Sequence, residues 1–365
     1  MRIGLDGTPL LGPRTGIGRY VEGLLTGLAD GPDELVLTAF TWRGAEPLDA
    51  IPGVRVRHRR APARLLQRSW ETLSWPPTEM LCGPVDVFHG TNYVLPPSRR
   101  AAGVVTVHDL SFLHHADTVE RATLRFQQLV PRSLARARAV CVLSETLATE
   151  VCDQYGVARD RVVVTRPGVG PAFTAAEPAP ADWLEARGLP PEYAVFVGSR
   201  EPRKGLPVLL QAWARLWNEG AAPPLCLVGP PGWGRAVDLS GLPAEAVRIP
   251  GFLLDADLPA VLASARLLAM PSRYEGFGIP PLEALATGTP VVVSDLPVFR
   301  ENLGTHARYA AVGDADALAE ALHAVLAAGP GTASDRQARR DHAATFTWQA
   351  CAAAARTAYA LAREG

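Results

Sequence analysis

Short apolar runs alternate with longer amphipathic segments along almost the whole of this 365-residue chain. Parallel strands joined by crossover helices produce this alternation, because each buried strand is followed by a helix that covers the sheet. The expected strands are Arg2–Leu5, Leu35–Phe40, Val54–Arg57, Val85–His89, Val104–His108, Ala139–Leu143, Val162–Thr165, Ala194–Gly198, Pro224–Val228, Val247–Ile249, Leu267–Met270 and Pro290–Ser294. The sequence therefore predicts an α/β fold of doubly wound parallel sheets.

A loop-rich stretch interrupts the alternation from Gly168 to about Pro191, where proline and glycine cluster without periodicity. Because domains commonly hold ~100–200 residues, we expect a Rossmann-like domain over 1–170, a second over 171–345, and an alanine-rich helix over 346–365. Ligands of open α/β sheets bind outside the carboxyl ends of the strands. We therefore expect functional residues in the loops after strands, lining a central cleft between the two domains.

Composition disfavours several classes of function. The formal net charge is −1, so the chain has no electrostatic drive toward nucleic acid. No apolar stretch approaches the ~18–20 residues of a membrane span, and the amino terminus lacks the pattern of a signal peptide. The five cysteines form no C-x-x-C pair, which favours reduced thiols. We expect a cytoplasmic protein whose membrane contact, if present, is peripheral to the inner face.

All but one of the 36 basic residues are arginine, and the exception is Lys204. A codon bias toward arginine explains the depletion of lysine. Lysine offers a compact point charge, whereas arginine offers a rigid planar fork. The single retained lysine therefore indicates a position where the chemistry requires a compact cation.

The segment Pro271–Pro290 holds two glutamates eight positions apart, Glu275 and Glu283. Its glycines allow the backbone to approach a ligand closely, and the pair Pro280–Pro281 suits the first turn of a helix. The amino end of such a helix suits a phosphate, and the two carboxylates suit sugar hydroxyls. Together they indicate a sugar nucleotide. From the spacing alone, a capped helix with solvent-facing glutamates is the alternative.

In the context EGFGIPPLEALATGTPVV, this segment resembles the signature of the family 4 glycosyltransferases, retaining enzymes of the GT-B fold, and the similarity spans nearly the whole chain. The resemblance implies that Glu283 holds the ribose of a nucleotide and that Glu275 lies by the donor sugar ring. It also implies that the 346–365 helix, which matches the family's final F-x-W segment, crosses back to the first domain. The further donor-binding residues implied in this segment are Gly276, Phe277, Gly278 and Ile279.

Three cations stand in the turn of the segment Val195–Gly205, namely Arg200, Arg203 and Lys204. A departing diphosphate needs cations, because negative charge develops on it as the glycosidic bond breaks. Lys204 matches the lysine of the family pattern, whereas Ser199 stands where the family has an arginine. The second cation is therefore Arg203 or Arg200, and we favour Arg203.

In the first domain, the loop GPRTGIGRY comes too late after its strand to fit a dinucleotide fingerprint. It resembles the family's amino-terminal glycine-rich loop, which implies that Gly16 and Gly18 lie near the donor phosphate.

His108 ends a strand, and the matching family histidine lies beside the transferred sugar. We therefore expect catalytic roles for His108, Lys204 and Glu275. The loop His89–Tyr93 is expected to line the acceptor site.

Two Asp-x-Asp triplets, Asp255–Asp257 and Asp314–Asp316, raise the question of a divalent metal. Both precede helical segments, where aspartate is a favoured cap, so we expect neither a metal nor a cofactor.

The loop Gly251–Leu254 matches the segment that contacts the base in this family. The basic stretch Arg55–Arg68 suits either a solvated surface or contact with an anionic acceptor or lipid headgroup.

The residues and the resemblance together predict a retaining, metal-independent hexosyltransferase that uses a nucleoside diphosphate sugar and an acceptor hydroxyl. GDP-mannose is the first donor to expect, and the acceptor is a glycan, a lipid-linked glycan or a small natural product such as an aminoglycoside. A sugar-nucleotide 2-epimerase of the GT-B fold is the alternative enzyme. A two-lobed sugar-binding protein, which would carry a secretion signal, is the alternative of another class. The oligomeric state is not predicted.

Overall fold

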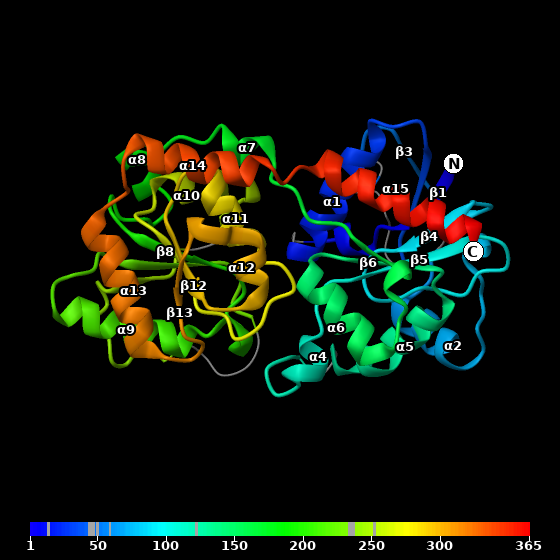
Figure 1. The fold of residues 1–365 in the computed structure, drawn as a ribbon, viewed down its shortest axis with the longest axis horizontal. Helices are drawn as coiled ribbons and strands as arrows, with labels where there is room; N and C mark the ends of the chain where they lie inside the picture. Colours follow the sequence, from blue (N-terminus) through cyan, green and yellow to red (C-terminus); the bar gives the residue numbers. More distant parts are fainter. Residues whose placement is uncertain are drawn as a thin grey trace. The chain divides into compact units, whose positions relative to one another are not determined.

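The computed structural model of the chain describes residues 1–12, 15–42, 48, 51–57, 60–120, 123–232, 238–250 and 253–365. The chain divides into two compact units, and each unit is discontinuous in sequence. The first unit comprises Met1–Leu110, Leu124–Gly168 and Thr347–Gly365, and the second comprises Ser111–Thr123 and Val169–Phe346. Both chain termini therefore belong to the first unit (Figure 1).

A seven-stranded sheet forms the centre of the first unit, with the strand order β3-β2-β1-β4-β5-β6-β7. Each neighbouring pair in its described part is parallel. The strands are β1 (Arg2–Asp6), β2 (Glu34–Thr38), β3 (Val54–Val56), β4 (Val87–Gly90), β5 (Ala102–Val107), β6 (Ala139–Val142) and β7 (Val162–Val164). Central strands such as β5 are buried along their whole length, as expected of a parallel sheet that helices cover on both faces.

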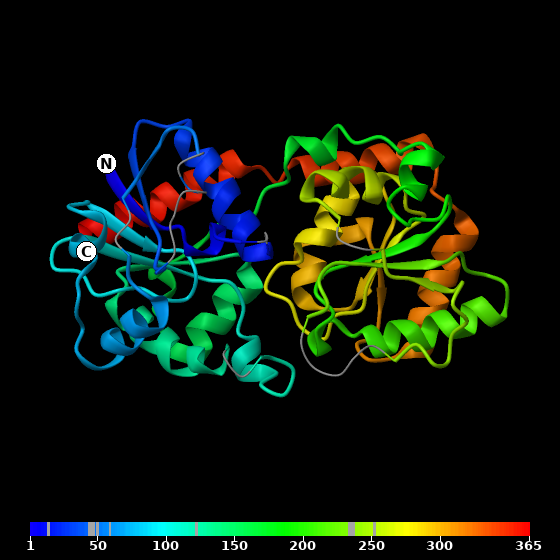
Figure 2. The ribbon, with the colours of Figure 1, turned by 180° about the vertical axis from the view of Figure 1, so that it is seen from behind.

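Helices cover both faces of this sheet, as the views from the front and from behind show (Figures 1 and 2). They are α1 (Gly16–Ala29), α2 (Ala63–Thr72), α3 (Thr78–Cys82), α5 (Phe126–Arg136), α6 (Glu145–Tyr155) and α15 (Trp348–Glu364). The last helix, α15, packs against α1 and against strands β5, β6 and β7. Gly23 of α1 makes the close packing possible, because a Cβ atom there would lie 2.1 Å from the ring of Trp348.

A six-stranded parallel sheet with the order β10-β9-β8-β11-β12-β13 forms the centre of the second unit. Its strands are β8 (Ala194–Val197), β9 (Leu225–Val228), β10 (Val247–Arg248), β11 (Leu268–Met270), β12 (Val291–Ser294) and β13 (Arg308–Ala310). The helices of this unit are α4 (Ser111–His114), α7 (Pro171–Thr174), α8 (Ala181–Glu185), α9 (Leu206–Asn218), α10 (Leu258–Ser264), α11 (Ile279–Ala286), α12 (Pro297–Leu303), α13 (Ala315–Ala328) and α14 (Ala333–Ala344). Helices α9 and α13 pack together, and buried Phe196, Trp213 and Leu322 lie in the core between them and the sheet.

All twelve strands that the sequence predicts are present, and the prediction missed β13, whose residues Arg308–Ala310 are too few and too polar to form an apolar run. The stretch Gly168–Pro191, expected to be a loop-rich linker, instead contains α7 and α8. Helices of four and five residues are too short to show a helical period in a sequence. No helix in the described part of the chain is both long enough and apolar enough to cross a membrane.

Candidate functional site

A tight turn, Pro202–Lys204, follows the loop after β8 and leads directly into α9. Gly205 has a φ of 70°, and a Cβ atom there would lie 2.0 Å from the carbonyl oxygen of Pro271. Glycine alone suits this backbone conformation together with this close approach. The backbone N–H of Arg273 also donates to the carbonyl of Arg203 at 2.8 Å. The cationic turn is thereby held against the segment that follows β11.

Five side chains meet where these two segments touch, and we name them the Glu275 cluster: Glu201, Arg203, Lys204, Ser272 and Glu275. Lys204 Nζ and Ser272 Oγ both donate to Glu275 Oε1, each at 2.7 Å. Arg203 Nη1 donates to Glu275 Oε2 at 2.9 Å, and its Nη2 donates to Glu201 Oε1 at 2.8 Å. Both oxygens of Glu275 are thus held by cations, and the side chain of Lys204 is only 11% exposed.

The charges of the Glu275 cluster fix the protonation state of its central carboxylate. Burial disfavours the charged form of Glu275, but Lys204 and Arg203 outweigh it and lower the pKa of the carboxyl group to about 2. Glu275 is therefore ionised throughout the physiological pH range, so it cannot serve as a general acid there, and its low pKa makes it a weak base. Arg200, the alternative second cation, donates to the carbonyl of Gly229 at 3.2 Å and is not part of the cluster.

Helix α11 begins four residues after Glu275, as the proline pair predicts. Gly278 precedes it with a φ of 92°, and a Cβ atom there would lie 2.4 Å from the ring of Phe299. No side chain caps this helix, and its second and third residues are prolines without an N–H. The amides of Gly278 and Ile279 are therefore the donors that this amino end can offer an anion. Glu283 lies one turn inside α11 and is 5% exposed.

Tyr274, beside the Glu275 cluster, carries two aromatic contacts that the sequence did not predict. The rings of His114 and His115 lie 5.8 and 5.5 Å from its ring centroid. These histidines belong to the segment Ser111–Thr123, which separates from the first sheet and joins the second unit. The contact explains why the second unit is discontinuous in sequence.

In the first unit, His108 directly follows β5, as predicted. Its Nε2 lies 2.7 Å from the carbonyl of Thr91, so Nε2 carries the proton and donates. Burial lowers the pKa of His108 to about 4, despite the opposing effects of this bond and of Asp109. His108 is therefore neutral at physiological pH, and its Nδ1 presents a lone pair that can accept a hydrogen bond from a hydroxyl.

Asp6, at the end of β1, is a candidate that the sequence prediction missed. Thr91 Oγ1 donates to the Asp6 carbonyl at 2.6 Å, which links Asp6 through Thr91 to His108 at the same edge of the sheet. Burial raises the pKa of the Asp6 carboxyl group to about 6, although hydrogen bonds from Thr8 oppose the rise. An acidic residue directly after an apolar strand was the signal that could have identified it.

The glycine-rich loop reaches α1, whose first residue is Gly16. Thr15 caps this helix, because its side chain accepts from the backbone N–H of Gly18 at 3.3 Å. Gly16 is exposed and Gly18 is buried. The structure therefore places Gly16 and Gly18 with His108 in the first unit, whereas the Glu275 cluster and Glu283 lie in the second. The role of Gly16 and Gly18 beside a phosphate stays a prediction.

His89 was expected in a loop that lines the acceptor site, and this prediction is wrong. His89 lies inside β4 and is fully buried. Its Nδ1 is hydrogen-bonded to Tyr359 at 2.8 Å and its Nε2 to Thr106 at 2.7 Å. Both ring nitrogens are satisfied within the fold, so His89 joins β4 and β5 to α15.

The two Asp-x-Asp triplets have different structural roles. Asp314 caps α13, because its side chain accepts from two backbone N–H groups, as predicted. Asp257 precedes α10 without a capping bond and instead pairs with Arg187 at 3.0 Å. That part of the capping prediction is wrong, because a nearby guanidinium binds the carboxylate. Within the described residues, no group of three or more potential metal ligands lies together.

Two further predictions can be followed only in part. Of the loop Gly251–Leu254, residues 251 and 252 lie outside the described residues, and Leu254 is exposed. In the basic stretch Arg55–Arg68, Arg55 pairs with Glu34 at 3.1 Å, and Arg59 lies outside the described residues. The contact between this stretch and an anionic partner stays a prediction.

Comparisons with known proteins now decide the family. The family described as Glycosyl transferases group 1 matches residues 191–328, and the one described as Glycosyltransferase Family 4 matches residues 14–173. O-antigen chain mannosyltransferase B of Escherichia coli is 30% identical over 99% of this chain and 100% of its own length. The chain belongs to glycosyltransferase family 4. The resemblance seen in the sequence is thereby confirmed.

This family 4 glycosyltransferase is also similar to 2-deoxystreptamine glucosyltransferase of Streptomyces kanamyceticus, with 32% identity over 73% of this chain and 69% of that protein. Among solved structures, sucrose-phosphate synthase from Thermosynechococcus elongatus covers 98% of both chains with a TM-score of 0.77 and 20% identity. Anabaena HepE in complex with UDP-glucose covers 98% of this chain and 99% of its own, with a TM-score of 0.71 and 20% identity. The family 4 glycosyltransferase therefore has the predicted GT-B fold of two Rossmann-like domains.

Proposed function

We propose that this glycosyltransferase is a retaining hexosyltransferase that moves a hexose from a nucleoside diphosphate sugar to an acceptor hydroxyl. The Glu275 cluster is the observation that carries this proposal. It holds a buried lysine and a half-buried arginine, both from the turn before α9, against the loop that leads into the amino end of α11. Two positive groups and free backbone amides suit the diphosphate of a sugar nucleotide.

Each donor-site residue has a proposed role. Lys204 and Arg203 stabilise the departing diphosphate, and the backbone from Gly276 to Ile279 lies near the diphosphate and sugar. Glu283 holds the ribose, and Glu275 orients both cations beside the sugar ring. The positions of the two glutamates support these roles, because Glu275 lies in the loop before α11 and Glu283 lies one turn inside that helix.

The transfer step is proposed to occur on one face of the sugar. The bond between the anomeric carbon and the phosphate oxygen breaks, and the acceptor oxygen bonds to that carbon from the same side. The leaving phosphate takes the proton of the acceptor hydroxyl. Glu275 is a weak nucleophile because two cations hold it, which supports this path over a covalent intermediate.

Neutral His108 accepts a hydrogen bond from a sugar hydroxyl. Because Lys204 and Arg203 supply positive charge, no metal is needed.

We propose GDP-mannose as the donor and a glycan, free or lipid-linked, as the acceptor, because a relative that spans the whole chain is an O-antigen mannosyltransferase. A small natural product is the second acceptor class, since another relative is a 2-deoxystreptamine glucosyltransferase. The described cysteines are free thiols, which suits a reducing cytoplasm.

Two measurements test this function. The first is the thermal stability of the protein with GDP, UDP, dTDP and ADP and their sugars, since a ligand at 100 times its dissociation constant stabilises the folded state by ~2.7 kcal/mol. Stabilisation by GDP-mannose alone supports GDP-mannose as the donor, and no stabilisation by any nucleotide contradicts the proposed donor site.

The second measurement is turnover with glycan and aminocyclitol acceptors in the presence of EDTA, with the anomeric configuration of the product read by NMR. Inversion, loss of activity in EDTA, or epimerisation without an acceptor would each refute the corresponding part of the proposal.

A further inference from the structure

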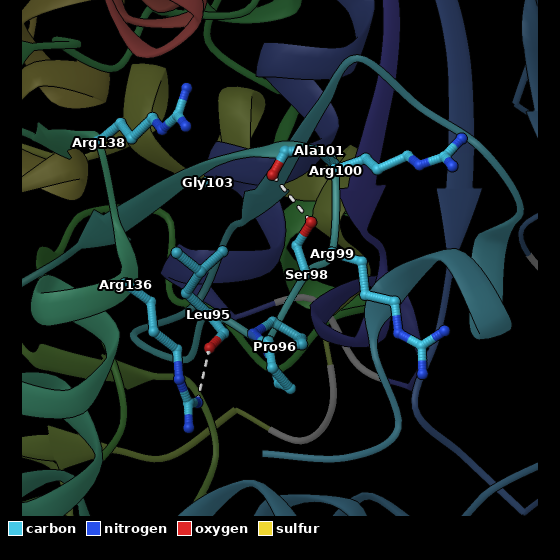
Figure 3. A pocket seen from close by; sticks show the side chains of 10 residues that line it. Leu95, Pro96, Ser98, Arg99, Arg100, Ala101, Gly103, Arg136 and Arg138 are labelled. Atoms are coloured by element: carbon cyan, nitrogen blue, oxygen red, sulfur yellow. Dashed lines mark hydrogen bonds between the residues drawn. The ribbon is translucent and has the colours of Figure 1, made fainter. Parts of the chain in front are cut away.

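A cavity of about 270 Å³ lies in the first unit at the amino ends of β5 and β6. Four arginines line it, but their guanidinium groups point away from one another (Figure 3). Arg136 and Arg138 instead donate to the backbone carbonyls of Leu95 and Ala362, each at 3.3 Å. Because phosphate recognition uses guanidinium groups that converge on the ligand, these arginines do not form a phosphate site.

In the second unit, a buried asparagine of α12 contacts the loop before α11. Asn302 is fully buried, and its Nδ2 donates to the carbonyl of Phe277 at 2.9 Å. A carbonyl oxygen can only accept a hydrogen bond, so the atom that faces Phe277 is the amide nitrogen of Asn302. The contact therefore fixes the peptide group between Phe277 and Gly278, directly before α11.

This contact determines the direction of the Gly278 N–H. The peptide group is trans, and in a trans peptide group the C=O of one residue and the N–H of the next point in opposite directions. With the Phe277 carbonyl held toward α12, the Gly278 N–H points away from α12. Within the part of the chain that the structure describes, no hydrogen bond takes up this N–H. It is therefore available to an anion at the amino end of α11.

The same loop is also held from α14 and the residues that follow it. His342 Nε2 donates to the carbonyl of Asn302 at 2.8 Å, and the His342 ring lies edge-on to Phe346, with centroids 5.6 Å apart. Phe346 in turn lies edge-on to Phe277, with ring centroids 6.1 Å apart. Phe277 is thus held through both its backbone and its side chain, which restricts the peptide group to one orientation.

Stability alone does not explain an amide at position 302. The Oδ1 atom of Asn302 is buried and has no hydrogen-bond partner among the described residues. A buried unpaired oxygen costs about as much free energy as the bond from Nδ2 gains. An apolar residue of the same size would let the peptide group rotate and take the Phe277 carbonyl to another partner. The contribution of the amide therefore lies in the direction that it imposes on this carbonyl.

We propose that Asn302 is a positioning residue for donor binding, which orients the Phe277–Gly278 peptide group so that the Gly278 N–H faces the diphosphate of the sugar nucleotide. This inference rests on the proposed function, because it requires a diphosphate at the amino end of α11. A backbone N–H aimed at a phosphate oxygen forms a charge-assisted hydrogen bond. In the rotated peptide group, a carbonyl oxygen would face the phosphate and repel it.

The test uses the full chain and two variants without the amide donor. Asn302→Leu keeps the size of the side chain, and Asn302→Ala is the second variant, in case leucine does not fit the buried position. The matched control is Tyr309→Phe, because Tyr309 holds α12 and the residue after it through the carbonyls of Phe299 and Gly304, at 3.3 and 2.6 Å.

Calorimetry measures the affinity of the wild type and the variants for GDP, UDP, dTDP and ADP. Ligand-observed NMR measures their affinity for the corresponding nucleosides, which lack the diphosphate. Circular dichroism and thermal unfolding verify that each variant folds.

The variants at position 302 should bind the nucleoside diphosphate that the wild type prefers at least about tenfold more weakly. Their affinity for its nucleoside should change less than about twofold, because the base and ribose do not contact this peptide group. Tyr309→Phe should change both affinities less than about twofold. This selective loss separates the orientation of the N–H from a general disturbance of α12.

Two outcomes overturn the inference and leave the donor site in place. One is unchanged binding of the nucleoside diphosphate in a folded variant at position 302. The other is an equal loss of nucleoside and nucleoside diphosphate binding, since that result would reflect general damage to the site. If the wild type binds no nucleoside diphosphate at all, the proposed function and this inference are overturned together.

Discussion

Lys204 is the lone lysine of an arginine-rich chain, and the structure shows what its side chain contacts. Its ammonium group lies 2.7 Å from Glu275 Oε1, while the adjacent Arg203 takes the other oxygen of the same carboxylate. The two cations thus share one carboxylate from opposite ends. An arginine at position 204 would place a second planar fork where the carboxylate has room for a compact donor. This packing gives a physical reason for the retained lysine.

Replacing Lys204 by arginine tests this reason. The variant keeps the charge, but the longer arginine side chain displaces Glu275 or Arg203 and misaligns the diphosphate. We therefore expect kcat/KM to fall at least about tenfold, which corresponds to a loss of ~1.4 kcal/mol of transition-state stabilisation. Steady-state kinetics with the preferred donor measure the effect. Arg215→Lys, an exposed change on α9, is the control. Unchanged turnover in Lys204→Arg would show that charge alone matters.

Asp6 makes a prediction about stability and pH. Its pKa is about 6 in the folded protein against 3.8 ordinarily, so the folded state binds more protons between these values and loses stability as the pH rises through this window. Asp6→Asn removes this cost. The variant should match the wild type near pH 4 and gain up to about 3 kcal/mol above pH 7.

Urea unfolding at pH 4.0, 5.5 and 7.5 measures this difference, and activity is measured on the same samples. Asp30→Asn, an exposed change at the end of α1, should alter stability little at any of these pH values. If Asp6 contacts substrate, Asp6→Asn gains stability and loses activity together. A variant less stable at pH 7.5 than the wild type would contradict the assignment of a carboxylate whose charged form is disfavoured by burial.

At the scale of elements, the donor-side motif could be predicted well because its elements begin and end at residues with strong local preferences. The proline pair stands in the first turn of α11, and glycines with positive φ precede both α11 and α9. What the sequence could not show is that the turn at Gly205 contacts Pro271, since that contact depends on two loops meeting across neighbouring strands β8 and β11. The pairing of Lys204 with Glu275 follows from this contact. It was therefore not predicted, although both residues were.

Gly205→Ala tests this contact between elements. The residue has a φ of 70°, and its Cβ atom would meet the carbonyl of Pro271, so the variant should lose more than about 2 kcal/mol of stability and most of its activity. Gly220→Ala is a matched control, because its φ is 65° but its Cβ atom would meet nothing within 4 Å. It should lose only about 1 kcal/mol. Equal losses in a denaturant titration would mean that φ alone, and not the contact, requires glycine.

At the scale of the whole molecule, the strand pattern predicts two α/β units, but not which distant segments join them. Residues 111–123 join the second unit, where the rings of His114 and His115 lie tilted against the ring of Tyr274, and no local pattern indicates such a partner. His89 was misassigned for the same reason, because its partner Tyr359 is 270 residues away. Side chains whose role depends on remote segments are the ones that sequence patterns place wrongly.

Removing residues 347–365 should therefore damage the first unit selectively. The deletion exposes the face of β5, β6 and β7 and leaves His89 without Tyr359. Hydrogen exchange should show lost protection in β4 to β7 and near-native protection in β8 to β13. A milder variant, Tyr359→Phe, should cost about 1–3 kcal/mol through the unpaired His89 nitrogen. Uniform loss of protection across both sheets would contradict two units of separate stability.

The discontinuity of the first unit also bears on how the protein is made. A ribosome releases the amino-terminal end first, and domains usually fold as they emerge. Here all seven strands of the first sheet have been synthesised once β7 is made, yet the helix that covers β5 to β7 follows residues 169–346 of the second unit in the sequence. The second unit has no such dependence after residue 346. During synthesis, the second unit can therefore finish folding before the first unit receives the helix that covers its sheet.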